Sequence, residues 1–402
     1  MPSVQSSQES ARATDERSLS WHREQTHTSR ETLAPEDIIT AMNNPLITLH
    51  TLGQRVWLDN LSRSLLRDGL LERLVGDDAL AGVTSNPTIF YKAISESAYY
   101  RDELAGLKRE AGLTPEQRYE RLAIRDIQDA CDLFHPLYVR TEGEDGYVSL
   151  EVSPELAYDA DATVAAGLRL KAEVNRPNLL IKVPATRPGL QAIEQLLGQG
   201  CSVNVTLMFS LDHVRDVSKA YMRGMEQWLG HSGADPRPIK SVASLFLSRV
   251  DTLVDKKLQT LGGDLLQLRG QAGVALAKLA YEEYKKVFEG PLFAPLAAKA
   301  VRRQYLLWAS TGTKNAEYSD VMYVEPLIGP ETINTLPDAT LNAFRDHGRA
   351  ALTLDRDLDR ARHVFAELGR HGISMGQVGD ELQTEGVKLF RQSFDQLIAL
   401  MS

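Results

Sequence analysis

The segment Asn178-Leu-Leu-Ile-Lys-Val-Pro-Ala-Thr186 places one lysine inside a stretch that otherwise predicts a fully apolar β-strand. Alternation along this strand puts Lys182 on the same face as Leu180, with three further aliphatic side chains on the opposite face. A buried ammonium is costly, so the lysine must either pair with an acid or lose its proton. A neutral amine attacks carbonyl carbon, which makes Lys182 a candidate to form a Schiff base. Taken alone, the segment fits an ion-paired or snorkelling lysine near a strand end better than a nucleophile.

Further short strands alternate with helical segments on both sides of this one. We expect eight strands, at residues 55–60, 82–86, 147–152, 178–184, 202–208, 241–247, 304–310 and 321–325. Leucines on one face predict a helix over 63–75, and Thr114-Pro-Glu-Gln117 is a capping box that starts a long helix. Ser210 is expected to cap another helix. These strand-then-helix units favour an α/β fold of the (β/α)8 TIM-barrel type over an open doubly wound sheet.

The chain departs from a minimal barrel at its two ends and after the second strand. Residues 1–44 begin with a long polar stretch, which predicts a disordered N-terminal tail. Residues 45–402 are expected to form a single TIM-barrel catalytic domain. The connection at 87–146 is long enough for additional helices, and a C-terminal helical extension is expected over about residues 332–402.

Composition limits the class of protein. The chain has 402 residues, a net charge of −9 and a pI near 5.6, which argue against general binding to nucleic acid or to anionic membranes. Its two cysteines, Cys131 and Cys201, form no CxxC pair, so a reducing cytoplasm fits better than a disulfide framework. We see no secretory signal and no apolar run long enough for a transmembrane helix. In an acidic protein, an anionic substrate requires a few positioned basic side chains.

Polar side chains gather at one end of several predicted strands. Five of them are Asp59, Asn86, Glu151, Asn204 and Thr206. Taken singly, Asn86 and Ser310 could be helix N-caps. Asn204 and Thr206 could instead bond to one another, and Asp59 could pair with an arginine. Together with the buried lysine, however, such a cluster would be costly as scaffold alone, and it favours an active site at the C-terminal ends of the strands.

With these residues in hand, the chain resembles the transaldolase family, in its longer bacterial form. Seven motifs occur in family order: VWLDNLSR (56–63), GVTSNPTIF (82–90), SLEVS (149–153), IKVPAT (181–186), NVTLMF (204–209), ASLFLSRVD (243–251) and WASTGTKN (308–315). They span the whole expected barrel, and seven motifs in order are far more specific than any one of them.

The resemblance implies a cofactor-free and metal-free transfer of dihydroxyacetone between sugar phosphates, in the non-oxidative pentose phosphate pathway. It implies that Lys182 forms the Schiff base, that Asp59 is the general acid/base, and that a pair of residues holds the catalytic water. That pair is Glu151 and Thr206. The implied substrate-binding residues are Asn86, Asn204, Ser244 and Phe246. The implied phosphate-binding residues are Arg249, Ser310 and Lys314, the last of these replacing the arginine of the shorter family pattern.

Two other functions stay open at this point. One is a fructose 6-phosphate aldolase-like activity that releases free dihydroxyacetone, although Phe246 in the pocket wall favours the transferase. The other is a non-catalytic sugar-phosphate-binding barrel, although binding alone has no need of a nucleophilic lysine. A metal-dependent aldolase finds little support, because the nine histidines show no paired ligand spacing. The expected partners are small sugar phosphates, with no nucleic acid and no membrane, and the protein is expected to be a monomer or a homodimer.

Overall fold

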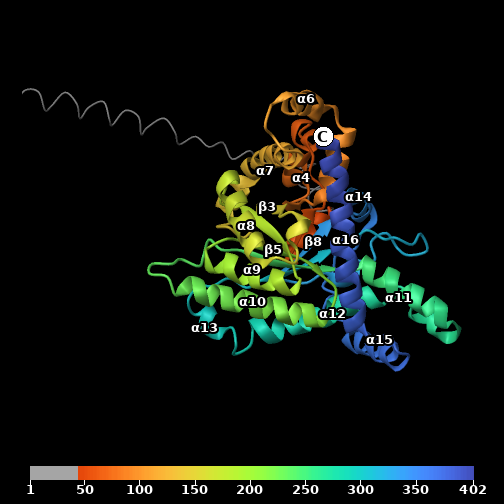
Figure 1. Ribbon diagram of the computed structural model, residues 1–402. Helices are drawn as coiled ribbons and strands as arrows, with labels where there is room; N and C mark the ends of the chain where they lie inside the picture. The colour runs from red at the N-terminus through yellow and green to blue at the C-terminus, as the bar shows by residue number, and fades with distance from the viewer. Residues whose placement is uncertain (1–43) are drawn as a thin grey trace, which may run out of the picture. The chain divides into compact units, whose positions relative to one another are not determined.

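A closed barrel of parallel strands forms the centre of the structure, a computed structural model that describes residues 44–402 (Figure 1). Within those residues, eight strands pair in chain order and the last pairs back with the first. The strands are β1 (Gln54–Leu58), β2 (Leu80–Thr84), β3 (Tyr147–Glu151), β4 (Leu179–Pro184), β5 (Val203–Met208), β6 (Ser241–Phe246), β7 (Tyr305–Ala309) and β8 (Thr332–Leu336). This arrangement confirms the predicted TIM barrel. The tail predicted over residues 1–44 lies outside the described residues except for Asn44.

Helices cover the outside of the barrel and connect its strands. In chain order, those between β1 and β7 are α3 (Arg63–Arg67), α4 (Leu70–Asp77), α5 (Pro87–Glu96), α6 (Arg101–Arg109), α7 (Pro115–Arg140), α8 (Ala160–Val174), α9 (Arg187–Gly198), α10 (Leu211–Leu229), α11 (Ser248–Leu261), α12 (Ala272–Phe288) and α13 (Ala294–Ala297). Short 3-10 helices are η1 (Ala98–Tyr100), η2 (Pro154–Leu156), η3 (Gly263–Leu268) and η4 (Glu325–Leu327). Helix α2 (Pro45–Thr51) precedes the barrel. Among residues 44–402, no helix combines the length and the apolar character needed to cross a membrane.

Local sequence signals start several of these helices as predicted. The Thr114 hydroxyl and the Gln117 side chain form the capping box of α7, and the Ser210 hydroxyl accepts from the His213 amide at the start of α10. The single helix predicted over 63–75 is wrong. Gly69 adopts a left-handed conformation with φ of 69°, which ends α3 and lets α4 begin in a new direction.

The eighth strand was predicted at residues 321–325, and this prediction is wrong. Residues 321–324 form a buried turn, whereas Thr332–Leu336 pairs with β1 on one side and β7 on the other. The apolar side chains of the turn, including Val321 and Tyr323, are buried against the barrel without joining its ladder. Residues 332–336 therefore belong to the barrel, and the additional C-terminal helices begin only at Asp338.

Three helices follow the barrel: α14 (Asp338–His347), α15 (Leu358–Arg370) and α16 (Met375–Met401). The last of these runs as a long straight helix across the view in Figure 1 and packs on α5, α7, α11 and β5. Its Gln383 side chain donates to the carbonyl oxygens of Ala185 and Leu207, at 3.0 and 3.1 Å. Because both carbonyls lie at or just beyond the ends of β4 and β5, α16 crosses the C-terminal end of the barrel.

Candidate active site

A cavity of about 310 Å³ opens at the C-terminal ends of the strands. Its walls come from most of the barrel strands, from the loops that follow them and from α16. They consist of Asp59, Thr84, Asn86, Thr88, Ile89, Lys182, Thr206, Ser244, Phe246, Arg249, Ala309, Ser310, Gly312, Lys314, Thr335, Pro337 and Phe390. Of the residues predicted for the site, all but Glu151 and Asn204 line this cavity. Parallel strands in a barrel bring such distant segments together because their C-terminal ends share one rim.

Lys182 and Glu151 form a buried pair in the wall of the barrel. The register of β3 and β4 places them side by side, and Lys182 Nζ lies 3.5 Å from Glu151 Oε2, with each side chain 5% exposed. Nζ also donates to the Ser85 carbonyl at 3.2 Å. Burial raises the pKa of Glu151 to about 7, although the Lys182 charge opposes the rise. Lys182 is therefore ion-paired, as one of the alternatives from the sequence required. Its partner is a carboxylate that can exchange a proton near neutral pH.

Asp59 lies just beyond the end of β1, on the cavity wall. Its Oδ1 accepts from the Thr84 hydroxyl at 2.9 Å, and that hydroxyl also contacts the Thr335 hydroxyl at 2.9 Å. Burial raises the pKa of Asp59, while Lys182 and the Thr84 hydrogen bond act against the rise. The threonines of β2 and β8 thus hold one carboxylate oxygen of Asp59, in the same cavity as the amine.

Two buried polar atoms next to the lysine have no hydrogen-bond partner among residues 44–402: Glu151 Oε2 and Thr206 Oγ1. Thr206 sits on β5, which pairs with β4, and its side chain faces the cavity. Each of these two atoms can still accept a hydrogen bond from a small polar ligand or donate one to it.

Asn204 faces the barrel interior beside Lys182 but does not line the cavity. Its Nδ2 donates to the Ser149 hydroxyl at 3.0 Å, and its Oδ1 accepts from the Ser244 hydroxyl at 2.7 Å. The alternative in which Asn204 and Thr206 bond to each other is wrong, because Asn204 bonds to these two serines and Thr206 Oγ1 has no hydrogen-bond partner among residues 44–402. Asn204 thereby fixes Ser244, which does reach the cavity.

Asn86 caps a helix, as one of its two predicted roles requires, and it also lies on the cavity wall. Its Oδ1 accepts from the Ile89 amide at 3.0 Å and caps α5, and the residue also lines the cavity. Ser310 does not cap a helix. It adopts a left-handed conformation with φ of 54°, and its hydroxyl lies 2.8 Å from that of Ser248 at the start of α11.

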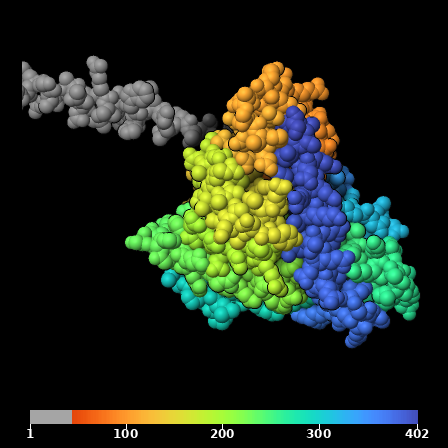
Figure 2. Space-filling model, in the orientation of Figure 1, coloured from red at the N-terminus to blue at the C-terminus, as the bar shows by residue number. Residues whose placement is uncertain are grey.

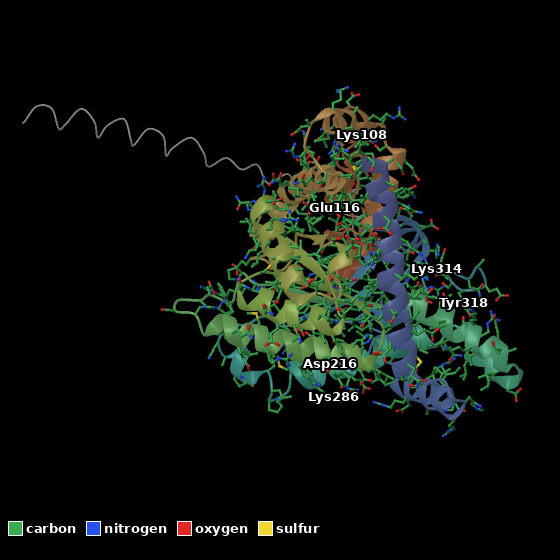
Figure 3. All side chains as sticks on the ribbon, viewed as in Figure 1. Lys108, Glu116, Asp216, Lys286, Lys314 and Tyr318 are labelled. Atoms are coloured by element: carbon green, nitrogen blue, oxygen red, sulfur yellow. The ribbon has the colours of Figure 1, made fainter. Side chains whose placement is uncertain are left out.

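Besides Lys182, the cavity has two basic side chains, one in α11 and one in the loop after β7. Arg249 stands in the first turn of α11, and its guanidinium carbon lies 5.5 Å from the ring centre of Phe246 and 5.8 Å from that of Phe390. Its Nη1 is buried without a hydrogen-bond partner within residues 44–402, and burial lowers the pKa of the guanidinium. Lys314 lines the same cavity and lies beside α11 in Figure 3. A desolvated cation with a free donor favours an anionic ligand.

The cavity residues that reasoning from sequence missed include Thr84, Thr335 and Phe390. The alternation of Thr332-Ile-Asn-Thr-Leu336 ahead of Pro337 is a strand signal that could have revealed Thr335. Phe390 lies among the apolar residues of a C-terminal helix, and no local signal separates it from core residues. Within the part of the chain that the structure describes, no cluster of His, Cys, Asp and Glu is placed to hold a metal ion.

Comparison with known proteins agrees with this arrangement. The family described as Transaldolase/Fructose-6-phosphate aldolase matches residues 56–401. A transaldolase of Thiobacillus denitrificans is 54% identical over 87% of this chain and 97% of its own length. Transaldolases of Neisseria gonorrhoeae and Frankia alni are 46% and 45% identical, over 88% and 90% of this chain and 98% and 97% of theirs. From its barrel, its buried lysine and these similarities, the chain belongs to the transaldolase/fructose-6-phosphate aldolase family.

Proposed function

We propose that this protein is a transaldolase, which moves a dihydroxyacetone unit from a ketose phosphate to an aldose phosphate through a Schiff base on Lys182. The observation that carries the proposal is the Lys182–Glu151 pair, with Glu151 at a pKa of about 7 and Asp59 on the same cavity. An amine, a proton acceptor beside it and a second carboxylate are the groups that this chemistry needs.

The first half-reaction begins when Lys182, as the free amine, attacks the C2 carbonyl of fructose 6-phosphate. Water leaves the carbinolamine, with Glu151 and Thr206 handling the proton and the water, and a protonated imine forms. Asp59 takes the proton of the C4 hydroxyl. The C3–C4 bond then breaks, its electron pair passes to the imine to give an enamine, and glyceraldehyde 3-phosphate leaves.

The second half-reaction reverses these steps with a new acceptor. The enamine carbon attacks the aldehyde carbon of erythrose 4-phosphate, and Asp59 returns its proton to the new hydroxyl. Hydrolysis of the imine releases sedoheptulose 7-phosphate and restores Lys182. Arg249, Lys314 and Ser310 are proposed to hold the phosphate of donor and acceptor, Asn86 and Ser244 to bind hydroxyl groups, and Asn204 to support Ser244 from beneath.

The second candidate is an aldolase that releases dihydroxyacetone after the first half-reaction. Phe246 favours the transferase, because its apolar ring lines the cavity, packs on Phe209 at 5.1 Å between ring centres and has no hydrogen-bonding group of its own to direct water. We further propose that the protein acts in the cytoplasm, where its buried free cysteines stay reduced, as a monomer or a homodimer.

The test is reduction with borohydride in the presence of fructose 6-phosphate, followed by mass analysis of the peptides. A three-carbon adduct on the Lys182 peptide is expected, and Lys182→Ala should lose both the adduct and essentially all transfer.

Lys240→Met is the matched control, since Lys240 is also buried and paired with a glutamate but lies outside the cavity. It should keep the adduct. A folded protein that binds sugar phosphate but forms no adduct would point instead to a non-catalytic binding barrel.

A further inference from the structure

The C-terminal helix α16 covers the catalytic cavity and contributes one side chain to it. In the space-filling view, α16 forms a continuous ridge over the molecule in blue (Figure 2). Its Phe390 is 5% exposed and lines the cavity. The residue lies outside the strand ends that carry the other functional side chains, and none of the seven sequence motifs contains it.

Phe390 lies close to two of the cations of the site, Lys182 and Arg249. Its ring centre lies 6.0 Å from Lys182 Nζ and 5.8 Å from the guanidinium carbon of Arg249. Phe246 approaches the same guanidinium at 5.5 Å from its ring centre. The two rings thus border Arg249, and only Phe390 also reaches the amine. An aromatic ring attracts cations through its face and offers no strong donor or acceptor to water.

We propose that Phe390 is a positioning residue that sets the outcome of the reaction. It fixes Arg249 relative to Lys182 and keeps water from the enamine, so that the bound three-carbon unit is transferred instead of released. This inference rests on the proposed function. It assigns to α16 a part in the chemistry, beyond its packing on the barrel.

The competing step is release of the three-carbon unit. A proton from water adds to the enamine carbon and regenerates the protonated imine. A second water adds to its C2, the C–N bond breaks, and dihydroxyacetone leaves as Lys182 regains its amine. The net reaction is cleavage of fructose 6-phosphate into dihydroxyacetone and glyceraldehyde 3-phosphate, and it requires water where the apolar ring now lies.

The test measures the ratio of dihydroxyacetone released to dihydroxyacetone transferred, with fructose 6-phosphate and erythrose 4-phosphate as substrates. Phe390→Ala should raise this ratio at least about tenfold, because water gains access to the enamine. The KM for fructose 6-phosphate should rise about fivefold, because Arg249 loses one ring. Phe390→Leu restores apolar volume without a ring, so the ratio should return close to that of the wild type while KM stays raised.

Leu397→Ala is the matched control. Leu397 lies two turns further along α16 and is fully buried, but it lines neither the catalytic cavity nor the small cavity beside Glu151. Its loss should lower the melting temperature about as much as Phe390→Ala, and leave the ratio unchanged. Should Phe390→Ala fail to fold, the KM of Phe390→Leu still decides whether the ring positions Arg249.

Two results would overturn the role of Phe390: a ratio in Phe390→Ala within twofold of the wild type, or an equal rise in Leu397→Ala. The borohydride adduct separates this failure from that of the proposed function. A wild-type adduct on Lys182 with an unchanged ratio removes only the role of Phe390, whereas a wild type without an adduct removes both.

Discussion

At the scale of single residues, the site combines groups whose burial is costly unless the chemistry uses them. Glu151 and Lys182 are each 5% exposed, and Asp59 lines the same cavity as Lys182. Burial raises the pKa of both carboxyl groups, so each is held closer to neutral pH than an exposed acid. A carboxylate with a pKa near the working pH can both accept and return a proton, as imine formation and hydrolysis demand.

The titration of Glu151 should therefore make the rate of imine formation fall on the acid side of its pH profile. Below a pH of about 7 Glu151 is protonated and cannot take a proton, so the rate should rise with pH and level off above that value. Asp59 also has a raised pKa, so the measurement is best made in Asp59→Asn, which lacks the proposed acid/base for bond cleavage but keeps the Lys182–Glu151 pair. The readout is the rate of borohydride trapping against pH.

Glu151→Gln tests the same group directly. Its rate of borohydride trapping should be about a hundredfold or more lower than that of the wild type, and this rate should no longer fall on the acid side of the pH profile. A fall near pH 4.5 in Asp59→Asn would show that Glu151 titrates as an ordinary carboxyl and is not the group that exchanges the proton.

The sequence reveals these residues unevenly, and the reason is physical. Lys182 stands out because a charge inside an apolar strand contradicts its surroundings, and Asp59 because it ends a strand. Phe390 gives no such signal, because an aromatic residue on the apolar face of a helix is typical of any hydrophobic core. Only the packing of α16 across the barrel shows which of its aromatic rings meets the cations.

At the scale of secondary-structure elements, the same limit explains the misplaced eighth strand. The run at 321–325 is apolar because its side chains fill the space beneath a turn. The true strand β8 carries polar side chains on both faces: Thr335 lines the cavity, whereas Asn334 on the opposite face donates to the Tyr323 carbonyl of the turn at 3.0 Å. Hydrophobicity therefore favoured the turn, and only pairing with β1 and β7 identifies the strand.

The close seating of α16 should make it sensitive to one added methyl group. A Cβ at Gly379 would come within 2.6 Å of Ser210 Cβ, so Gly379→Ala must push α16 away from the barrel. We expect a loss of about 1–3 kcal/mol in the free energy of unfolding, together with a higher KM as Phe390 moves. Denaturant unfolding and steady-state kinetics measure the two effects.

Gly376→Ala is the control, because its Cβ would meet only ordinary contacts, the nearest at 3.6 Å. Alanine is the better helix former, so this variant should be neutral or more stable by up to about 1 kcal/mol. If both alanines behaved alike, α16 would not be seated as closely as the structure indicates.

At the scale of the whole molecule, the two ends of the barrel have different tasks. The C-terminal end holds the catalytic cavity. At the N-terminal end, Lys240 is 1% exposed, pairs with Glu144 at 2.9 Å and lies over the Tyr305 ring at 4.2 Å. Arg302 also pairs with Glu144. Glu144 precedes β3, Lys240 precedes β6 and Arg302 precedes β7. The Glu144 carboxylate therefore links the N-terminal ends of three strands, at the end of the barrel opposite the proposed substrate site.

Glu144→Gln should therefore reduce stability and leave kcat and KM unchanged. Removing the carboxylate leaves the Lys240 ammonium buried without its counter-charge, which should cost about 2 kcal/mol because Glu144 itself is partly in contact with solvent. Lys240 holds the pKa of Glu144 below its usual value, so the stabilisation is present above about pH 4.5 and disappears as the pH falls through the lowered pKa. The melting temperatures of wild type and variant should thus converge in acid.

Glu110→Gln, which breaks an exposed pair with Arg121, is the control and should change the free energy of unfolding by no more than about 0.5 kcal/mol at any pH. A fall in kcat for a fully folded Glu144→Gln would mean that the two ends of the barrel are coupled.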